Sequence, residues 1–337
     1  MEKLLITGGS GFIGTNLIEK LRKEGKYELM SIDIVAPKID SHKDIWKQVD
    51  LRKADEVMEA VMAFMPDYVI ALGARTDLNG KTLDCYNANI GGVKNVLVAL
   101  EKVANLKRLI YASSMYVCEP GYMPKDFEDY APHTLYGESK VETEKIIKGF
   151  KSSPSTGSGT DCSNGSNYCW TIIRPTSIWG PWFGEPYDKF FRIVMNRMYF
   201  HMGERACKKT YGYIDNALYQ ILSILNAPED KVNKKVFYLG DYEGYDITEW
   251  SNEIAKECGF KIPRIPYFCF MLAGWFGDFL KLFGIHFPMT SFRLHNMTTD
   301  NVHNVSPIQE LAPNLPVSRV EGTKRTLDWI RNVEMKK

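Results

Sequence analysis

Short apolar segments alternate with amphipathic helical patterns over the first 150 residues. Runs of four or five apolar residues are typical of buried strands, and the longer stretches between them repeat apolar positions at helical spacing. This alternation predicts an α/β fold, a doubly wound parallel sheet with helices on both faces, which binds ligands at the carboxyl ends of its strands. The predicted strands are Leu4–Thr7, Leu29–Asp33, Trp46–Val49, Tyr68–Leu72 and Arg108–Ala112, and the predicted helices are Phe12–Glu24, Ala54–Phe64, Leu83–Ala104 and Thr134–Phe150.

A glycine-rich turn joins the first strand to the first helix. Gly8, Gly11 and Gly14 are spaced three residues apart. In a strand–turn–helix unit the first glycine permits a tight turn, the second lets a pyrophosphate approach the backbone, and the third lets helix and strand pack closely. The amide groups at the helix N-terminus then attract phosphates. This pattern predicts a dinucleotide site, in preference to a glycine turn that binds no ligand.

An acidic residue ends the second predicted strand. Asp33 lies about 19 residues beyond Gly14, where a carboxylate accepts hydrogen bonds from both hydroxyls of an adenosine ribose and repels a 2′-phosphate. The sequence therefore favours NAD over NADP. Asp50, after the third strand, has two open interpretations: a contact to the adenine amino group, or an N-terminal cap for the helix that begins at Ala54.

The overall composition narrows the class of protein. The chain has 337 residues, 45% of them hydrophobic and 25% charged, with a formal net charge of +1. These values are ordinary for a globular protein, and this charge indicates neither nucleic-acid binding nor electrostatic attraction to membranes. Seven cysteines at irregular spacings, without a paired C-x-x-C, indicate reduced thiols in the cytoplasm and no metal site.

One apolar segment near the C-terminus stands apart. Residues 265–287 are rich in aromatic side chains but are interrupted by Asp278, Lys281 and glycines. Their longest uncharged part is too short to span a bilayer, so no stable membrane insertion is expected. The segment is interpreted as a lid or a subunit-contact helix, with peripheral membrane contact as the alternative.

Candidate catalytic residues follow the fifth strand. That strand delivers Ser113 and Ser114 to the carboxyl edge of the sheet, and Tyr136 and Lys140 come some twenty residues later. Positions i and i+4 share a helix face, so both side chains can point into one cleft. A nearby cation favours the phenolate, which would lower the pKa of Tyr136 toward neutrality and make it a usable acid or base.

The combination resembles the extended short-chain dehydrogenase/reductase family, the group that contains NAD-dependent nucleotide-sugar epimerases and dehydratases. The segment from Thr7 to Gly14 is similar to its glycine signature, and Ser114, Tyr136 and Lys140 are similar to its catalytic set. The resemblance implies an NAD-binding Rossmann domain over residues 1–175. Within it, residues 151–167 have almost no large apolar side chain, so a flexible insertion is expected there. Residues 176–337 would form mainly a smaller α/β substrate lobe, with some segments returning to the Rossmann core.

The resemblance also implies roles for individual residues. Asn89 would line the NAD cleft, although a solvated or helix-bonding asparagine is an open alternative. Lys209 stands where an arginine commonly contacts the substrate diphosphate; Arg205 and Arg293 are other candidates, or are surface charges. The implied cofactor-binding residues are Gly8, Gly11, Phe12, Ile13, Gly14, Asp33, Asp50, Leu51, Leu72, Ala74, Asn89, Tyr111, Tyr136, Lys140 and Pro175, and the implied substrate-binding residues are Thr76, Ser114, Met115, Tyr136, Thr176 and Lys209.

The reaction is narrowed by a departure from the family pattern. Dehydratases of this family carry an Asp-Glu pair directly after the strand-end hydroxyl residue, whereas this chain has Met115 and Tyr116. The expected reaction is therefore NAD-dependent epimerisation of a nucleotide-linked sugar at C4, in a homodimer. The alternatives are a nucleotide-4-keto-sugar reductase or dehydrogenase, and a reductase of a bulky hydroxysteroid-like alcohol.

Overall fold

Seven parallel strands form the central sheet of the protein. The computed structural model describes residues 1–150, 168–184, 188–205 and 207–334; the predicted insertion at 151–167 lies outside them. The strands, in spatial order, are β11 (Lys235–Leu239), β6 (Cys169–Pro175), β5 (Arg108–Ala112), β4 (Tyr68–Ala71), β1 (Glu2–Thr7), β2 (Tyr27–Asp33) and β3 (Trp46–Gln48). The strand order reverses between β1 and β4, so the carboxyl end of β1 lies at the topological switch point, where doubly wound sheets bind their ligands.

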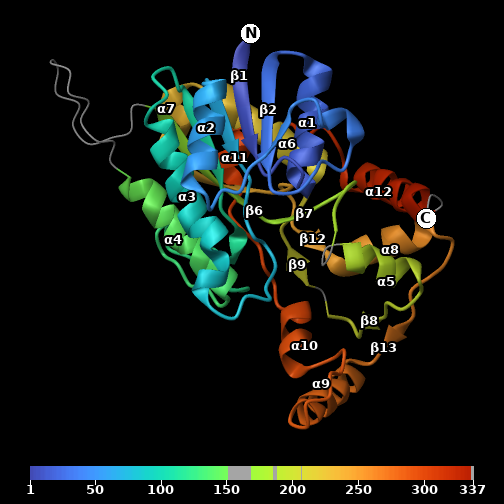
Figure 1. The fold of residues 1–337 in the computed structure, drawn as a ribbon. Coiled ribbons are helices and arrows are strands. Elements are labelled where there is room, and N and C mark those ends of the chain that lie inside the picture. Colours follow the sequence, from blue (N-terminus) through green and yellow to red (C-terminus); the bar gives the residue numbers. More distant parts are fainter. Residues whose placement is uncertain (151–167, 185–187, 206, 335–337) are drawn as a thin grey trace.

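Helices cover both faces of this sheet, which confirms the predicted doubly wound fold (Figure 1). Successive residues of a strand point to opposite faces. Leu4 and Ile6 of β1 therefore join one buried cluster with α1 (Phe12–Glu24) and α6 (Ile214–Asn226). Leu5 joins the other cluster, with α2 (Ala54–Phe64), α3 (Asn87–Leu100) and the inner part of α4 (Leu135–Gly149).

The predicted helix over Leu83–Ala104 is wrong at both ends. Residues Leu83–Tyr86 form a separate 3-10 turn, η2, and α3 begins only at Asn87. Tyr86 has φ −103° and ψ 24°, outside the helical region, which separates the two elements. At the other end the amides of Lys102 and Val103 bond to carbonyls three residues back, which tightens the chain into a turn after Leu100.

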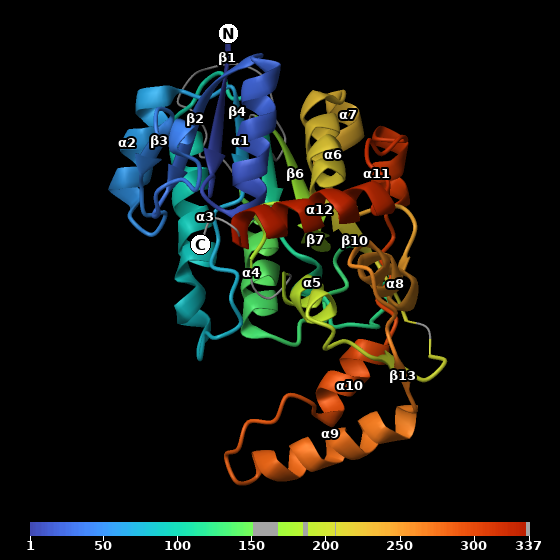
Figure 2. The same cartoon turned by 90° about the vertical axis from the view of Figure 1, so that its right-hand side faces the viewer.

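The chain after β6 builds a second layer below the sheet. Short strand pairs join β7 (Ser177–Trp179) to β10 (Tyr211–Tyr213), β9 (Lys208–Lys209) to β12 (Tyr245–Asp246), and β8 (His201–Met202) to β13 (Arg264–Ile265). Around them lie α5 (Asp188–Met195) and α8 (Ile247–Glu257), with Trp179, Phe191 and Trp250 in their shared core. The helices α7 (Glu229–Val232), α11 (Ser306–Leu311) and α12 (Arg319–Glu334) return toward the sheet (Figure 2).

Two helices project from this body. They are α9 (Tyr267–Lys281) and α10 (Ser291–Thr298), and they hang below the second layer in both ribbon views (Figures 1 and 2). Among the helices of the described residues, none is long and apolar enough to cross a membrane.

Candidate functional site

The glycine turn forms a close-packed cradle between β1 and α1. Gly8 has φ +74°, a conformation that suits glycine, and a Cβ there would collide with the backbone of Gly73. A Cβ on Gly14 would collide with the carbonyl oxygen of Gly8. Gly11 is the N-cap of α1 and offers no capping side chain, so the first amides of the helix are available to an anion. The residues therefore fit a dinucleotide phosphate.

Asp33 lies beside this cradle, as the sequence predicts. Its carboxylate accepts hydrogen bonds from the amide of Ser10 in the glycine turn, at 3.1 Å, and from the amide of Val35, at 3.2 Å. Burial raises the pKa of Asp33, and these amide bonds oppose that shift. The carboxyl group is thereby held in place at the end of β2, and its contact to ribose hydroxyls stays a prediction.

Asp50 does not cap the helix that follows it. The N-cap of α2 is Lys53, without a side-chain bond to the helix. The Asp50 carboxylate instead accepts from the backbone amide of Arg52, at 3.0 Å, and from its guanidinium, at 2.6 Å. The capping interpretation is therefore wrong, and the adenine contact stays a prediction.

Asn89 ties the loop after β4 to α4. It is fully buried, and its side chain accepts from the amide of Arg75, at 2.7 Å, and donates to the carbonyl of the same residue, at 3.0 Å. It also donates to the Ser139 hydroxyl on α4, at 2.9 Å. Asn89 is thus neither solvated nor bonded within its own helix, and it fixes the backbone that follows Leu72 and Ala74.

Ser114 and Tyr136 meet at the carboxyl edge of the sheet. Both side chains are buried, and the Ser114 oxygen accepts from the amide of Tyr116, at 3.2 Å, as the cap of a 3-10 turn. The Tyr136 ring lies against the rings of Tyr86 and Tyr116, with centroids 6.2 and 5.8 Å away. The sequence did not predict that these two tyrosines would contact Tyr136, and their rings orient the phenol.

Lys140 shares the inner face of α4 with Tyr136 but binds β5 directly. Its ammonium donates to the carbonyl of Ala112, at 2.8 Å, and to the Tyr111 hydroxyl, at 3.2 Å. Burial lowers the pKa of Lys140 to about 7, and the nearby charge of Glu144 opposes that shift. The predicted downward shift of the Tyr136 pKa is wrong for this arrangement: burial raises it to about 12, opposed by a hydrogen bond with Ser114.

A buried ion pair lies one turn beyond Lys140 on α4. Glu144 lies one turn after Lys140, and both of its carboxylate oxygens accept from the guanidinium of Arg174 on β6, at 2.8 Å. Tyr130 donates to the same carboxylate, at 2.9 Å, and Arg174 donates to the Tyr238 hydroxyl on β11, at 3.1 Å. The ring of His303 stacks on that of Tyr238, with the ring centroids 4.6 Å apart. We call these five residues, Tyr130, Glu144, Arg174, Tyr238 and His303, the Arg174 network.

The predicted substrate residues differ in how far they are buried and in which groups they contact. Met115 and Thr176 lie near the ends of β5 and β6, and the Thr176 hydroxyl donates to the carbonyl of Leu239, at 2.8 Å. Thr76 is exposed in the loop after β4. The Lys209 ammonium donates to the carbonyl of Asn296 on α10, at 2.7 Å, and burial lowers its pKa.

The other two candidates for the diphosphate are held elsewhere. The Arg205 guanidinium lies 3.7 Å from the centre of the Tyr267 ring, at the start of α9. The Arg293 guanidinium donates to the carbonyl of Pro288, at 2.9 Å. Both arginines thus contact the projecting part of the chain.

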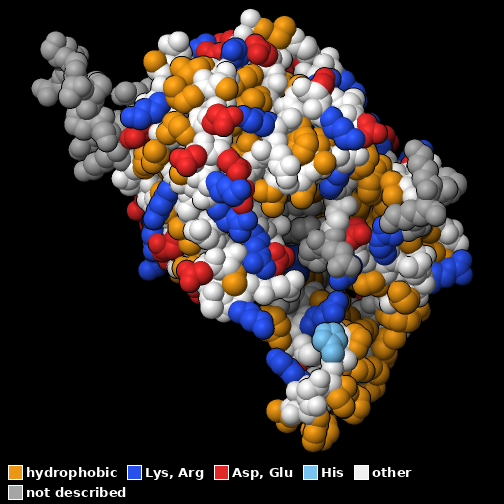
Figure 3. All heavy atoms as spheres, in the orientation of Figure 1, with side chains coloured by type: hydrophobic (Ala, Val, Ile, Leu, Met, Phe, Trp, Pro, Cys, Tyr) orange, Lys and Arg blue, Asp and Glu red, His pale blue; other side chains and the backbone are white. Residues whose placement is uncertain are grey.

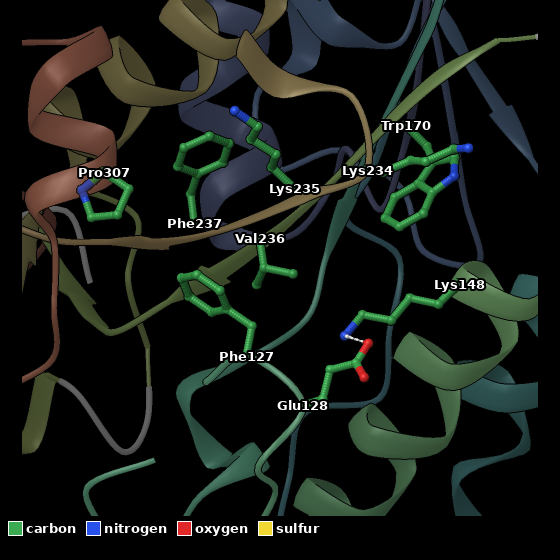
Figure 4. Close-up of a pocket in the computed structure, with 9 residues that line it drawn as sticks. All are labelled: Phe127, Glu128, Lys148, Trp170, Lys234, Lys235, Val236, Phe237 and Pro307. Atoms are coloured by element: carbon green, nitrogen blue, oxygen red, sulfur yellow. Dashed lines mark hydrogen bonds and ion pairs between the residues drawn. The ribbon is translucent and has the colours of Figure 1, made fainter. Parts of the chain in front are cut away.

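A separate pocket lies along the edge strand β11. Figure 4 shows it lined by Val236 and Phe237 of β11, Trp170 at the start of β6, and Phe127, with the ion pair between Lys148 and Glu128 at its rim. Trp170 and Val236 belong to the amino-terminal halves of their strands. The pocket is therefore distinct from the site at the carboxyl ends.

Comparison with known proteins supplies the family. The sequence pattern of the NAD dependent epimerase/dehydratase family matches residues 4–240. A 3-beta-hydroxysteroid dehydrogenase of Mycolicibacterium neoaurum is 26% identical, covering 79% of this chain and 72% of its own length. An N-acetyl-alpha-D-glucosaminyl-diphospho-ditrans,octacis-undecaprenol 4-epimerase of Escherichia coli O157:H7 is 24% identical, covering 97% of this chain and 95% of its own.

The fold is also similar to that of a solved structure. The structure of a UDP-glucose 4-epimerase from Thermotoga maritima, solved with UDP-glucose, superimposes with a TM-score of 0.74 and 19% identity, covering 98% of this chain and 99% of the other. The family match spans the glycine cradle, Ser114, Tyr136 and Lys140. The chain therefore belongs to the NAD-dependent epimerase/dehydratase family and is an enzyme that uses NAD.

Proposed function

We propose that this enzyme epimerises a nucleotide-linked sugar at C4 through a 4-keto intermediate. The observation that carries the proposal is the position of Tyr136 and Lys140 on the inner face of α4, with Ser114 beside Tyr136 at the same edge of the sheet as the glycine cradle. The similarity to the 4-epimerases of Escherichia coli and Thermotoga maritima supports the choice of carbon. Met115 and Tyr116, next to Ser114, offer no carboxyl group for an elimination.

The proposed division of labour follows the chain. Residues 1–175 would bind NAD, with the glycine cradle on the diphosphate and Asp33 on the ribose, and residues 176–337 would bind mainly the sugar nucleotide. When bound, NAD takes a hydride from the substrate carbon and returns it to the other face of the keto group. Lys209 would bind the substrate diphosphate, as a point charge without the two-pronged geometry of arginine.

Tyr136 is the proposed general base and acid. Its phenol would take the proton of the C4 hydroxyl during oxidation and give it back during reduction, while Ser114 donates a hydrogen bond to the same oxygen. A pKa of about 12 makes the phenolate scarce at neutral pH, so the base needs a cation close to it. We propose that Lys140, one helical turn away, supplies this charge when NAD and substrate are bound, since without them its ammonium donates to Ala112 and Tyr111.

Removal of the Tyr136 hydroxyl tests this proposal. Tyr136→Phe keeps the ring that packs against Tyr86 and Tyr116, so NAD binding is expected to persist while turnover falls on the order of a hundredfold or more. Turnover is measured by nuclear magnetic resonance as interconversion of UDP-glucose and UDP-galactose, and with a panel of other UDP-hexoses. Tyr116→Phe removes a neighbouring hydroxyl and serves as the matched control, with a change of a few-fold at most. Unchanged turnover in Tyr136→Phe would overturn the assignment.

A dehydrogenase or ketoreductase is the second candidate. The hydroxysteroid dehydrogenase relative favours a bulky, less polar alcohol as the substrate of such an enzyme. The same three residues would then act once per turnover, and NADH would be consumed or formed in proportion to product. Epimerisation leaves the amount of NADH unchanged, which distinguishes the two reactions.

We also propose that the enzyme works in the cytoplasm as a homodimer. The described cysteines are free thiols, which fits a reducing compartment. The resemblance to dimeric family members supports the assembly, and sedimentation of the purified enzyme tests it.

A further inference from the structure

The projecting helices form a hairpin whose apolar side chains face the solvent. We call residues 267–298, which comprise α9, α10 and the turn between them, the α9–α10 hairpin. The exposed side chains of α9 include Phe268, Leu272, Trp275, Phe276 and Phe279, each more than half accessible to solvent. Their spacing of three and four residues places them on one face of the helix. A core helix buries such a stripe, whereas α9 presents it to the outside.

The packing of the hairpin fixes this orientation. The opposite face of α9 carries Gly274 and Gly277, both buried, and a Cβ on Gly277 would collide with the carbonyl oxygen of Met289. The Asp278 carboxylate accepts from the amide of Ser291, at 3.3 Å, and holds the start of α10 against α9. Turning the apolar stripe inward would break this close contact, so the stripe faces away from the rest of the hairpin.

The apolar surface continues around the tip. In the turn, Leu282 is 81% exposed, and Phe283 and Ile285 are also more than half exposed. On α10, Phe292 is 66% exposed. Figure 3 shows hydrophobic side chains gathered along the lower edge of the projection, with Lys, Arg and His side chains above them. Contiguous apolar surface of this kind marks an interaction site in a folded protein.

The charges around this surface are mostly positive. Between residues 261 and 298 the sequence has four cations, Lys261, Arg264, Lys281 and Arg293, and a single carboxylate, Asp278, which faces the amide of Ser291. Arg264 pairs with Glu204, so three cations, Lys261, Lys281 and Arg293, stand against this one carboxylate. Aromatic side chains beside lysine and arginine are the composition of helices that lie in the interface of an anionic bilayer, with the cations reaching the headgroups.

We propose that the α9–α10 hairpin docks the enzyme on the surface of an anionic lipid bilayer. With 15 residues, α9 is about 22 Å long at 1.5 Å per residue, so it lies in the plane of the interface and does not span the bilayer. The apolar stripe enters the boundary between headgroups and acyl chains. The inference is independent of the proposed reaction, because it uses no residue of the catalytic site.

Vesicle flotation of the full-length enzyme with its cofactor tests the docking. The enzyme is expected to float with phosphatidylcholine vesicles that contain phosphatidylglycerol, and more weakly with phosphatidylcholine alone or at high salt. The double variant Trp275→Glu, Phe279→Glu is expected to lose at least about tenfold in partitioning. Met123→Glu, Val320→Glu changes two exposed apolar residues elsewhere and is expected to bind as the wild type does.

A second variant and two further measurements distinguish the bilayer from the other possible roles of the exposed apolar face. Lys281→Glu keeps the apolar stripe and is expected to weaken binding to the anionic vesicles about fivefold or more. If the wild-type enzyme bound neither kind of vesicle, the proposal would be overturned. So would vesicle binding that is equal for the wild type and the double variant. An oligomer that the double variant dissociates, in an enzyme that ignores vesicles, would assign the face to a second copy. A several-fold change in KM for a soluble substrate in the double variant, in an enzyme that does not bind vesicles, would identify the hairpin as a lid over the substrate site.

Discussion

The Arg174 network and the α9–α10 hairpin place their side chains in opposite ways. In the network an arginine and a glutamate are fully buried, and their charges meet each other and two tyrosine hydroxyls. In the hairpin, Trp275 and its aromatic neighbours are exposed. Each arrangement is unfavourable by itself, because a buried charge loses hydration and an exposed apolar stripe orders water.

The difference between them shows where each cost is offset. The network joins α4 to β6 and β11, and it is completed within one chain, directly behind Lys140. It therefore fixes the helix that carries the proposed catalytic residues. The hairpin has no such complement among the described residues, and its partner is expected to come from outside the chain. Substitutions in the two regions should accordingly separate stability from surface binding.

The largest effect is expected from Glu144→Gln. The change leaves the buried guanidinium of Arg174 without a negative partner, so the free energy of unfolding should fall by about 3 kcal/mol or more. Glu142→Gln, two residues earlier, breaks an exposed pair with Lys145 and should change the free energy of unfolding by less than about 1 kcal/mol. Urea unfolding with saturating NAD measures both. Equal effects would show that the network adds nothing to stability.

An acid-dependent loss of stability is expected from His303. Burial, with the charge of Arg174, lowers the pKa of His303 from 6.5 to about 4. Between these values the unfolded chain binds a proton that the folded protein resists, so stability is complete above pH 6.5 and falls as the pH drops toward 4. The shift corresponds to about 3 kcal/mol. His303→Gln should flatten the dependence of unfolding on pH over this range, and an unchanged slope would contradict the assignment.

The smallest effect is expected in the hairpin. Trp275→Glu should change the free energy of unfolding by less than about 0.5 kcal/mol, because the side chain is exposed in the free protein. Trp250→Ala, in the buried core of the second layer, should cost about 3 kcal/mol or more. A large loss of stability in Trp275→Glu would mean that the stripe is already covered within the enzyme.

Local signals accounted for much of the fold and part of the site. The helices α1 and α2 begin and end at the predicted residues, since glycines bracket the first and polar residues precede the second. The sequence also predicted that the glycine turn and Asp33 would meet, because a known unit joins them. It could not predict the pairing of Glu144 with Arg174, 30 residues apart, which depends on β6 lying beside α4. The burial that sets the Tyr136 pKa is likewise a property of the assembled site.

The most direct test of the proposed epimerisation is the nucleotide content of the purified enzyme. The protein is denatured, and the supernatant is analysed for NAD and NADH. About one equivalent of tightly held nucleotide per chain is expected, because an epimerase reuses its cofactor within each turnover. A nucleotide-free protein that binds added NADH and consumes one equivalent for each keto sugar reduced would contradict epimerisation and establish a reductase.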